Sequence, residues 1–136
     1  MTNTFTAPRP RVLLVEDDRD VAAVVCLALE DLFEVIHAAT AQSARSLIRS
    51  ACPELVLLDW CLGSDSGQEV LAELELISPA HRPAVIITSG GEEEVYNESL
   101  RRGLACRLPK PYSLEDLVKM VTLQLGLRTR QQEGHQ

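Results

Sequence analysis

The sequence has few of the features that define several common protein classes. Aromatic residues make up only 4% of its 136 residues, and no apolar run approaches the roughly 18 residues that a transmembrane helix needs. Basic residues are outnumbered, with 13 Lys and Arg against 20 Asp and Glu, which gives a net charge of -7. Such a chain has no electrostatic reason to bind phosphate backbones or anionic lipids. We therefore expect neither direct nucleic-acid binding nor membrane insertion.

Cysteine pairs are also missing. The four cysteines, Cys26, Cys52, Cys61 and Cys106, are far apart and form no Cys-x-x-Cys motif. This spacing argues against a zinc site and against thioredoxin-type redox chemistry. The first ten residues lack the charged start and apolar core of a secretory signal. A reducing, cytoplasmic location fits this sequence best.

Short apolar runs alternate with segments of helical periodicity along the chain. The runs are four to six residues long and rich in Val, Ile and Leu, which is typical of strands buried on both faces; they cover residues 11–15, 33–38, 55–58, 84–87 and 105–108. Apolar residues between and after them follow the i, i+3, i+4 rule, in segments 21–32, 44–51, 70–77, 95–100 and 114–125. Thr40 and Ser113 are candidate helix N-caps.

This alternation predicts an α/β fold, with five parallel strands and five helices that cover both faces of the sheet. We expect one domain over residues 11–127, preceded by a disordered extension at 1–10 and followed by a flexible tail at 128–136. A doubly wound sheet of this kind binds its ligands at the carboxyl ends of the strands. The residues that directly follow each strand are therefore the candidates for function.

Those residues include acids, a hydroxyl and a lysine. Glu16 and Asp17 follow the first predicted strand, Asp59 the third, Thr88 the fourth and Lys110 the fifth. Two carboxylates ~5 Å apart repel by roughly 3 kcal/mol at an effective dielectric constant near 20. A hard divalent cation, Mg²⁺ or Mn²⁺, would offset this repulsion and leave positions open for a phosphate group. The cluster thus predicts phosphoryl transfer to Asp59, with Lys110 neutralising the phosphoryl oxygens and the Thr88 hydroxyl donating to one of them.

At these positions the chain resembles the receiver domain of two-component response regulators, the family that includes the bacterial chemotaxis regulator. The matching residues are Glu16, Asp17, Asp59, Gly67, Thr88 and the pair Lys110–Pro111. The resemblance implies a flavodoxin-like fold of strand order 2-1-3-4-5 and a cis proline after the lysine. We expect either a stand-alone receiver or a receiver cut from a longer chain such as a hybrid kinase. It further implies a phosphohistidine donor, either a sensor histidine kinase or a histidine phosphotransfer protein, and a downstream protein effector that recognises the phosphorylated form.

The resemblance also assigns finer roles. It implies that the backbone carbonyl of Cys61 is a further metal ligand and that Tyr96, Arg107 and Tyr112 lie on a partner-binding face. Three positions depart from the family pattern. Glu16 replaces the commoner Asp, and Gly63 stands where proline is usual. Arg107 occupies a position where the family usually has a Tyr or Phe. The rotamer of that aromatic residue normally changes, inward or outward, with the movement of the switch hydroxyl, which is Thr88 in this chain.

Three other functions compete with phosphoryl acceptance. A pseudo-receiver would bind partners without being phosphorylated. A phosphatase with an aspartyl nucleophile would need a second acid two residues after Asp59, where Cys61 stands. A flavodoxin would have to place the flavin phosphate against Glu16 and Asp17, which would repel it. We expect a protein that is itself the phosphoryl acceptor rather than an enzyme acting on a separate substrate.

Overall fold

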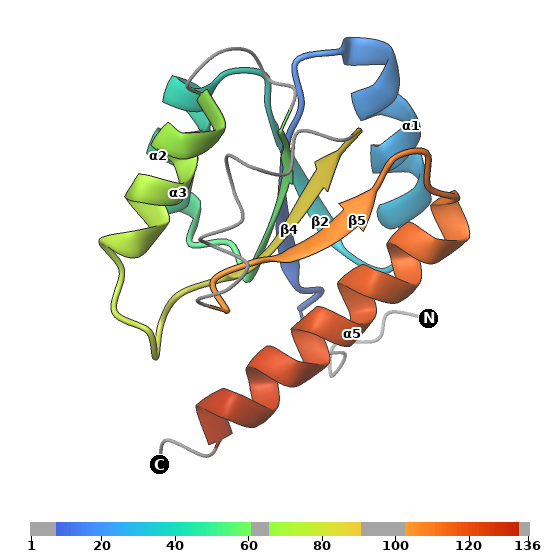
Figure 1. Cartoon of the computed structure of the whole chain (residues 1–136). Coiled ribbons are helices and arrows are strands. Elements are labelled where there is room, and N and C mark those ends of the chain that lie inside the picture. Colours follow the sequence, from blue (N-terminus) through green and yellow to red (C-terminus); the bar gives the residue numbers. More distant parts are fainter. Residues whose placement is uncertain (1–7, 61–65, 91–102, 134–136) are drawn as a thin grey trace.

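The computed structural model describes residues 8–60, 66–90 and 103–133, and its centre is a five-stranded parallel sheet (Figure 1). The strands are β1 (Arg11–Val15), β2 (Glu34–Ala38), β3 (Leu55–Asp59), β4 (Ala84–Ser89) and β5 (Cys106–Pro109). They are arranged in the order β2-β1-β3-β4-β5, and every neighbouring pair is parallel. The predicted flavodoxin-like topology is confirmed.

Helices cover the sheet on both sides. They are α1 (Arg19–Leu29), α2 (Ala41–Ala51), α3 (Ser66–Glu75) and α5 (Leu114–Glu133). Figure 1 shows α1 and α5 on one face and α2 and α3 on the other. The predicted helical segment 95–100 lies outside the described residues. Helix α5 continues past Leu127, where we expected the domain to end, and the Arg128 Nε donates to the carbonyl of Arg82 at 3.2 Å.

The core has two halves because the strands are buried on both sides. Leu13, Val15, Val56 and Leu58 pack with α2 and α3, whereas the alternate residues of the same strands pack with α1 and α5. Strand β3 is buried along its whole length, including Asp59 at its end. A strand buried on both faces explains why its sequence is a continuous apolar run instead of an alternating one.

Helix α1 buries only part of the apolar pattern in the predicted segment 21–32. The structure buries Ala22, Val25 and Leu29, whereas Val21 is 38% exposed and Val24 is 49% exposed. Two apolar stripes overlap on this helix, and the spacing rule fits both of them. Packing against the sheet and α5 selects the stripe that contains the small Ala22 side chain.

Three helices begin at side-chain caps. The Thr40 hydroxyl accepts the Ser43 amide at 3.1 Å, and the Ser113 hydroxyl accepts the Asp116 amide at 3.0 Å, so both predicted caps are confirmed. The Asp18 carboxylate caps α1 by accepting hydrogen bonds from the backbone amides of Asp20 and Val21. This cap fixes the start of α1 directly after the acidic residues that follow β1.

A buried acid joins α2 to α3. Glu73 on α3 is 6% exposed and receives two 2.8 Å bonds from the Arg49 guanidinium and a 3.3 Å bond from Arg45. These arginines lower the pKa of Glu73 from 4.5 to about 2. The carboxylate therefore stabilises the fold above pH 4.5, and this contribution is lost as the pH falls toward 2.

Replacement of this acid should destabilise the protein in a pH-dependent way. We expect Glu73→Gln to lower the free energy of unfolding at pH 7 by about 2 kcal/mol, the usual value of charge-assisted hydrogen bonds. The difference from wild type should shrink below pH 4.5, because Glu73 of the unfolded wild-type chain then takes up a proton that the folded protein does not bind until the pH nears 2. Urea unfolding followed by circular dichroism at several pH values measures both effects. The exposed Glu69→Gln, on the same helix, is the control, and an equal loss in that variant would contradict the assignment.

Candidate functional site

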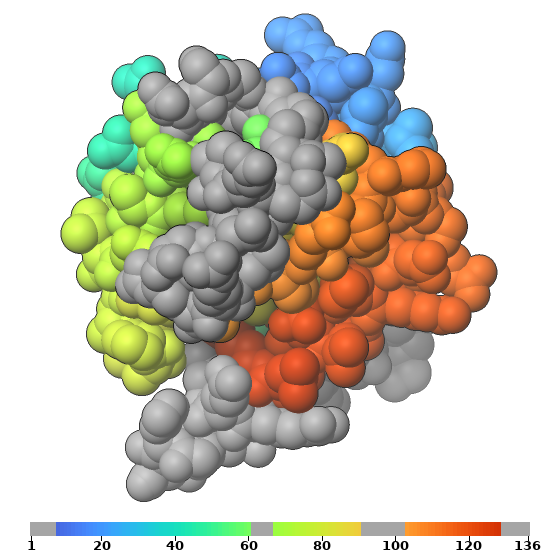
Figure 2. Space-filling model, in the orientation of Figure 1, coloured from blue at the N-terminus to red at the C-terminus, as the bar shows by residue number. Residues whose placement is uncertain are grey.

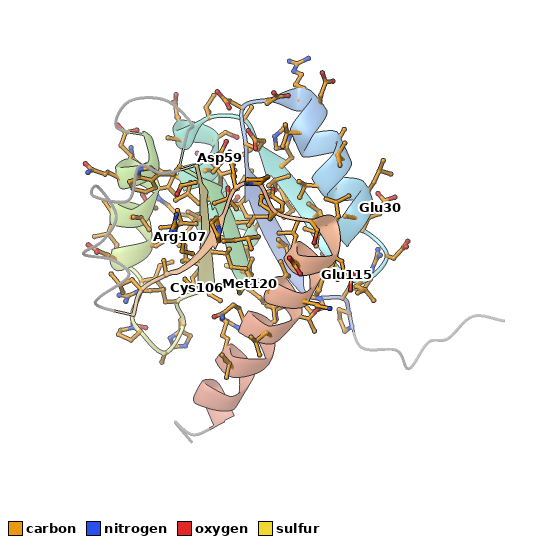
Figure 3. All side chains as sticks on the ribbon, turned by 45° about the vertical axis from the view of Figure 1, so that its right-hand side comes forward. Glu30, Asp59, Cys106, Arg107, Glu115 and Met120 are labelled. Carbon is orange, nitrogen blue, oxygen red and sulfur yellow. The ribbon has the colours of Figure 1, made fainter. Side chains whose placement is uncertain are left out.

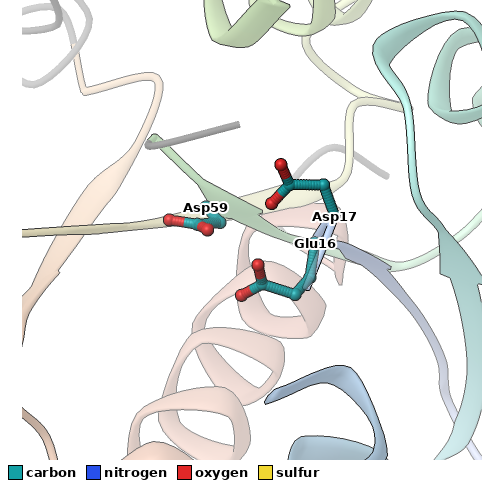
Figure 4. A group of neighbouring side chains, drawn as sticks. All are labelled: Glu16, Asp17 and Asp59. Atoms are coloured by element: carbon teal, nitrogen blue, oxygen red, sulfur yellow. The ribbon is translucent and has the colours of Figure 1, made fainter. Parts of the chain in front are cut away.

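The carboxyl ends of β1 and β3 bring three acids together. Because β1 and β3 are neighbours in the sheet, Glu16 and Asp17 after β1 lie beside Asp59 at the end of β3. One carboxylate oxygen of each residue lies within 4.8 Å of the other two. Figure 4 shows the Glu16 and Asp17 side chains extending to the same side of β1, toward Asp59. Glu16 and Asp59 are each 5% exposed, whereas Asp17 is open to solvent.

Lys110 and Thr88 complete the cluster from the other side. The Lys110 ammonium lies 2.7 Å from Asp59 Oδ1, and its backbone amide donates to the Ser89 carbonyl at 2.8 Å. The peptide bond between Lys110 and Pro111 is cis, as the resemblance implies. Thr88 is paired with Asp59 in the β3–β4 register and is 3% exposed. All five residues singled out from the strand ends thus lie at one edge of the sheet.

Negative charge dominates this edge. Burial, a side-chain hydrogen bond with Asp59 and the charge of Asp59 raise the pKa of Glu16 from 4.5 to about 7, although the Asp18 amide and Lys110 act in the opposite direction. One ammonium group therefore does not balance three neighbouring carboxylates. Oxygen ligands from carboxylates are the ligands that Mg²⁺ and Mn²⁺ prefer. The donor set fits a hard divalent cation.

Two aromatic residues border the acids. Tyr112 is half-buried, and burial together with the charges of Glu16 and Asp59 raises the pKa of its hydroxyl, with Lys110 opposing. The Trp60 amide donates to the Thr88 carbonyl at 2.9 Å. A Cβ at Gly67 would lie 2.7 Å from the Trp60 ring, so the glycine lets the indole pack against the start of α3. The sequence matched Gly67 to the family without giving this steric reason.

Other predicted site residues have different outcomes. Cys61, Gly63 and Tyr96 lie outside the described residues. Arg107 is half-buried on β5, and Figure 3 labels it beside the neighbouring strand residue Cys106, whose thiol contacts Met120 of α5. Arg107 lies within β5, and Tyr112 lies between β5 and α5.

The sequence did not indicate that a histidine contacts the main chain of Glu16, one of the acids that follow β1. The Nε2 atom of His37, on β2, lies 2.7 Å from the Glu16 carbonyl oxygen, and no motif in the sequence indicates this contact. His81 contacts the Ser78 hydroxyl through Nδ1 at 3.0 Å. The pairing of β1 with β2 creates the His37 contact, so only the strand register could have revealed it.

The acids form the one group of three or more potential ligands that meets at a point within residues 8–60, 66–90 and 103–133. Across the same part of the chain, no helix has both the length and the apolar character required to cross a membrane. The site chemistry of the described protein is therefore concentrated at the carboxyl edge of the sheet.

The fold and the site together define a class of protein. A doubly wound parallel sheet carries an acidic cluster and a paired lysine at the edge where such folds bind phosphate-containing ligands. The family model described as the response regulator receiver domain matches residues 12–122, and the chain belongs to this family. It is a receiver domain of two-component signalling systems.

Known relatives agree with this assignment. The chain is 34% identical over 113 residues to the phosphate regulon transcriptional regulatory protein PhoB of Escherichia coli, covering 82% of this chain and 49% of PhoB. It is 30% identical over 126 residues to the alginate biosynthesis transcriptional regulatory protein AlgB of Pseudomonas aeruginosa, covering 92% of this chain and 28% of AlgB. The chain therefore spans half or less of the length of these relatives.

Solved structures of receiver domains match over nearly their whole length. The signal receiver domain of a LuxO repressor protein from Vibrio parahaemolyticus superposes with a TM-score of 0.79 at 29% identity, covering 90% of this chain and 95% of that one. A CheY-like receiver domain from Methanospirillum hungatei gives a TM-score of 0.80 at 26% identity, covering 90% and 98%. The likeness thus extends through the entire receiver fold.

Proposed function

We propose that Asp59 accepts a phosphoryl group from a phosphohistidine and that the phosphorylated form is recognised by a partner protein. The observation that carries this proposal is the meeting of Glu16, Asp17 and Asp59 within 4.8 Å, with the Lys110 ammonium 2.7 Å from Asp59. Burial of Asp59 excludes most water from the acceptor, while the exposed Asp17 marks the open side of the site.

The proposed step is a simple displacement at phosphorus. A carboxylate oxygen of Asp59 attacks the phosphorus atom, the phosphorus–nitrogen bond of the donor breaks, and the leaving imidazole nitrogen keeps the electron pair and takes up a proton. The product is a mixed anhydride on Asp59. The Lys110 ammonium stabilises the negative phosphoryl oxygens, and the Thr88 hydroxyl donates a hydrogen bond to one of them.

A divalent cation belongs to this proposal. Glu16, Asp17, Asp59 and the Cys61 backbone carbonyl would hold Mg²⁺ or Mn²⁺, since all four offer oxygen ligands. When bound, the ion would neutralise the charge that three acids and a phosphoryl group bring together. Glu16 reaches one methylene further than an aspartate at the same position and is fixed by the Asp18 amide, 3.2 Å from its Oε2.

The proposed partners follow from the position of the site. A sensor histidine kinase or a histidine phosphotransfer protein must bring its phosphohistidine to the carboxyl edge of the sheet. Val21, Val24 and Leu27 on α1 are exposed apolar residues in the helix that begins beside the acids, and they offer contact area to such a donor.

The effector is proposed to bind the face that includes Tyr96, Arg107 and Tyr112. Figure 2 shows β5 and α5, in orange and red, forming one surface of the molecule. Tyr112 lies at the junction between this surface and the acids, because it follows Lys110–Pro111 and feels the charges of Glu16 and Asp59. Phosphorylation of Asp59 would therefore alter the electrostatic environment of Tyr112 and, through it, this face.

The proposal is tested with the purified chain. After incubation with acetyl phosphate and Mg²⁺, the intact mass should rise by one phosphoryl group, and EDTA should prevent the gain. A purified phosphohistidine donor should transfer its label to the chain under the same conditions. No phosphate uptake with Mg²⁺ present would contradict the proposal and favour the pseudo-receiver alternative.

Metal affinity should depend on pH. Because the pKa of Glu16 is raised to about 7, protons compete with the cation below pH 7, and we expect Mg²⁺ binding to be about tenfold weaker at pH 6 than at pH 8. Fluorescence of Trp60, the single tryptophan, measures the dissociation constant. In Glu16→Gln, the affinity should be lower and nearly independent of pH in this range. A wild-type affinity that is constant from pH 6 to pH 8 would contradict the prediction.

A further inference from the structure

We propose that His37 is a positioning residue for the metal-binding turn: its imidazole holds the peptide between Glu16 and Asp17 and thereby sets the directions of both carboxylates. This inference rests on the proposed function, since it concerns the same acidic site. It gives a role to a side chain on β2 that is not itself part of the acidic cluster.

The first observation is the hydrogen bond itself. His37 Nε2 lies 2.7 Å from the Glu16 carbonyl oxygen. A carbonyl oxygen can only accept, so Nε2 carries the proton and the imidazole is the donor. The distance is short for a bond between nitrogen and oxygen, whose usual value is about 2.9 Å.

The second observation is where the sheet ends. The Glu16 amide donates to the Ala38 carbonyl at 3.0 Å, which continues the pairing of β1 with β2 by one bond. Strand β2 stops at Ala38, and Thr40 already caps α2. The His37 side chain supplies the donor for the Glu16 carbonyl at this point. Two consecutive residues of β2 thus fix both polar groups of the Glu16 main chain.

The third observation concerns what this restraint opposes. Glu16, Asp17 and Asp59 repel one another at separations within 4.8 Å. The Glu16 carbonyl belongs to the peptide that carries the amide of Asp17, so rotation of that peptide would move both side chains. The Asp18 amide holds the Glu16 carboxylate, and Asp18 is tied to α1 as its cap. The His37 hydrogen bond restrains the rotation of the peptide between Glu16 and Asp17, which the bonds of the Asp18 amide and the Glu16 amide leave free.

The consequence is a defined effect on metal binding. Residues that orient metal ligands through a hydrogen bond typically change affinity by 10–100-fold when they are replaced. His37 acts on the backbone of one ligand and leaves every ligand atom in place. We therefore expect His37→Ala to weaken Mg²⁺ binding by about tenfold, the lower end of that range. The loss should be overcome by raising the Mg²⁺ concentration.

The experiment compares His37→Ala and His37→Gln with wild type, because glutamine retains an N–H donor on a side chain of similar reach. His81→Ala is the matched control, since His81 is also exposed but binds Ser78 in the turn before β4, at the opposite edge of the sheet. Trp60 fluorescence gives the Mg²⁺ dissociation constant, and intact mass gives the rate of phosphorylation by acetyl phosphate. The melting temperature in EDTA reports on the fold without metal.

The expected result has three parts. His37→Ala binds Mg²⁺ about tenfold more weakly and is phosphorylated slowly at low Mg²⁺ but at the wild-type rate at saturating Mg²⁺. His37→Gln recovers most of the affinity. His81→Ala matches wild type, and the melting temperature in EDTA is nearly the same for all four proteins.

Two results would overturn the inference. One is an Mg²⁺ affinity for His37→Ala within about twofold of wild type, well below the effect of ligand-orienting residues. The other is a loss that accompanies a lower melting temperature and is not recovered in His37→Gln, which would show a purely structural role. Wild-type protein that binds Mg²⁺ but takes up no phosphate would contradict the proposed function alone. Wild-type protein that binds no Mg²⁺ would contradict both proposals.

Discussion

Asp59→Asn is expected to abolish phosphoryl uptake from acetyl phosphate completely, whereas the wild-type chain gains one phosphoryl group. The amide keeps the size and most of the shape of the side chain but removes the nucleophilic carboxylate and the partner of Lys110, 2.7 Å away. No other carboxylate described at this edge is both buried and paired with a lysine. Intact mass measured over a time course gives the extent of phosphorylation.

The control for this prediction is Asp31→Asn, because Asp31 is an exposed acid after the C-terminal end of α1, whereas the acidic site lies before the start of that helix. It should be phosphorylated at the wild-type rate. Circular dichroism should show that both variants are folded. A gain of phosphate in Asp59→Asn equal to that of wild type would place the acceptor elsewhere and refute the assignment of Asp59.

Asp17→Asn is expected to produce the largest loss of metal affinity. Asp17 is the exposed member of the acidic cluster, so its replacement disturbs little packing but removes a full charge and a ligand. We expect Mg²⁺ binding to weaken by about 100-fold or more, beyond the effect of an orienting residue. Phosphorylation by acetyl phosphate should decrease in parallel at low Mg²⁺. Trp60 fluorescence and intact mass measure the two effects.

The same variant makes a second, opposite prediction for stability. Without metal, removal of one of three mutually repelling carboxylates should leave the free energy of unfolding unchanged or raise it by about 1 kcal/mol, the repulsion expected for a partly exposed pair. Asp20→Asn, an exposed acid in the first turn of α1, should change neither the affinity nor the stability appreciably. A strongly destabilised Asp17→Asn would show that this residue supports the fold rather than the metal site.

The strands and the site could be predicted because they depend on short stretches of sequence. The strand predicted at residues 11–15 coincides with β1, because a strand buried on both faces is a continuous apolar run in the sequence. Once the strands are known, the rule that parallel sheets bind ligands at the carboxyl ends of their strands places Glu16, Asp59 and Lys110 at the same edge of the sheet. Only the order of the strands required the family resemblance.

The parts that could not be predicted depend on contacts between distant residues. The buried face of α1 could not be predicted because two apolar stripes fit its periodicity, and packing against the sheet decides between them. Glu73 gives no sign in the sequence that arginines of α2 surround it. His37 reaches Glu16 only through the pairing of two strands. In each case the deciding partner lies on another element of the fold.

Trp60 has a position with a consequence for how motion spreads from the acceptor. Its amide is bonded to the Thr88 carbonyl on β4, while its ring lies against Gly67 at the start of α3. The residue next to Asp59 is thus mechanically linked to two separate elements. A displacement of the backbone at Trp60 would therefore move β4 through the hydrogen bond to Thr88 and move α3 through the contact with Gly67. The fluorescence emission of the indole would change with this displacement.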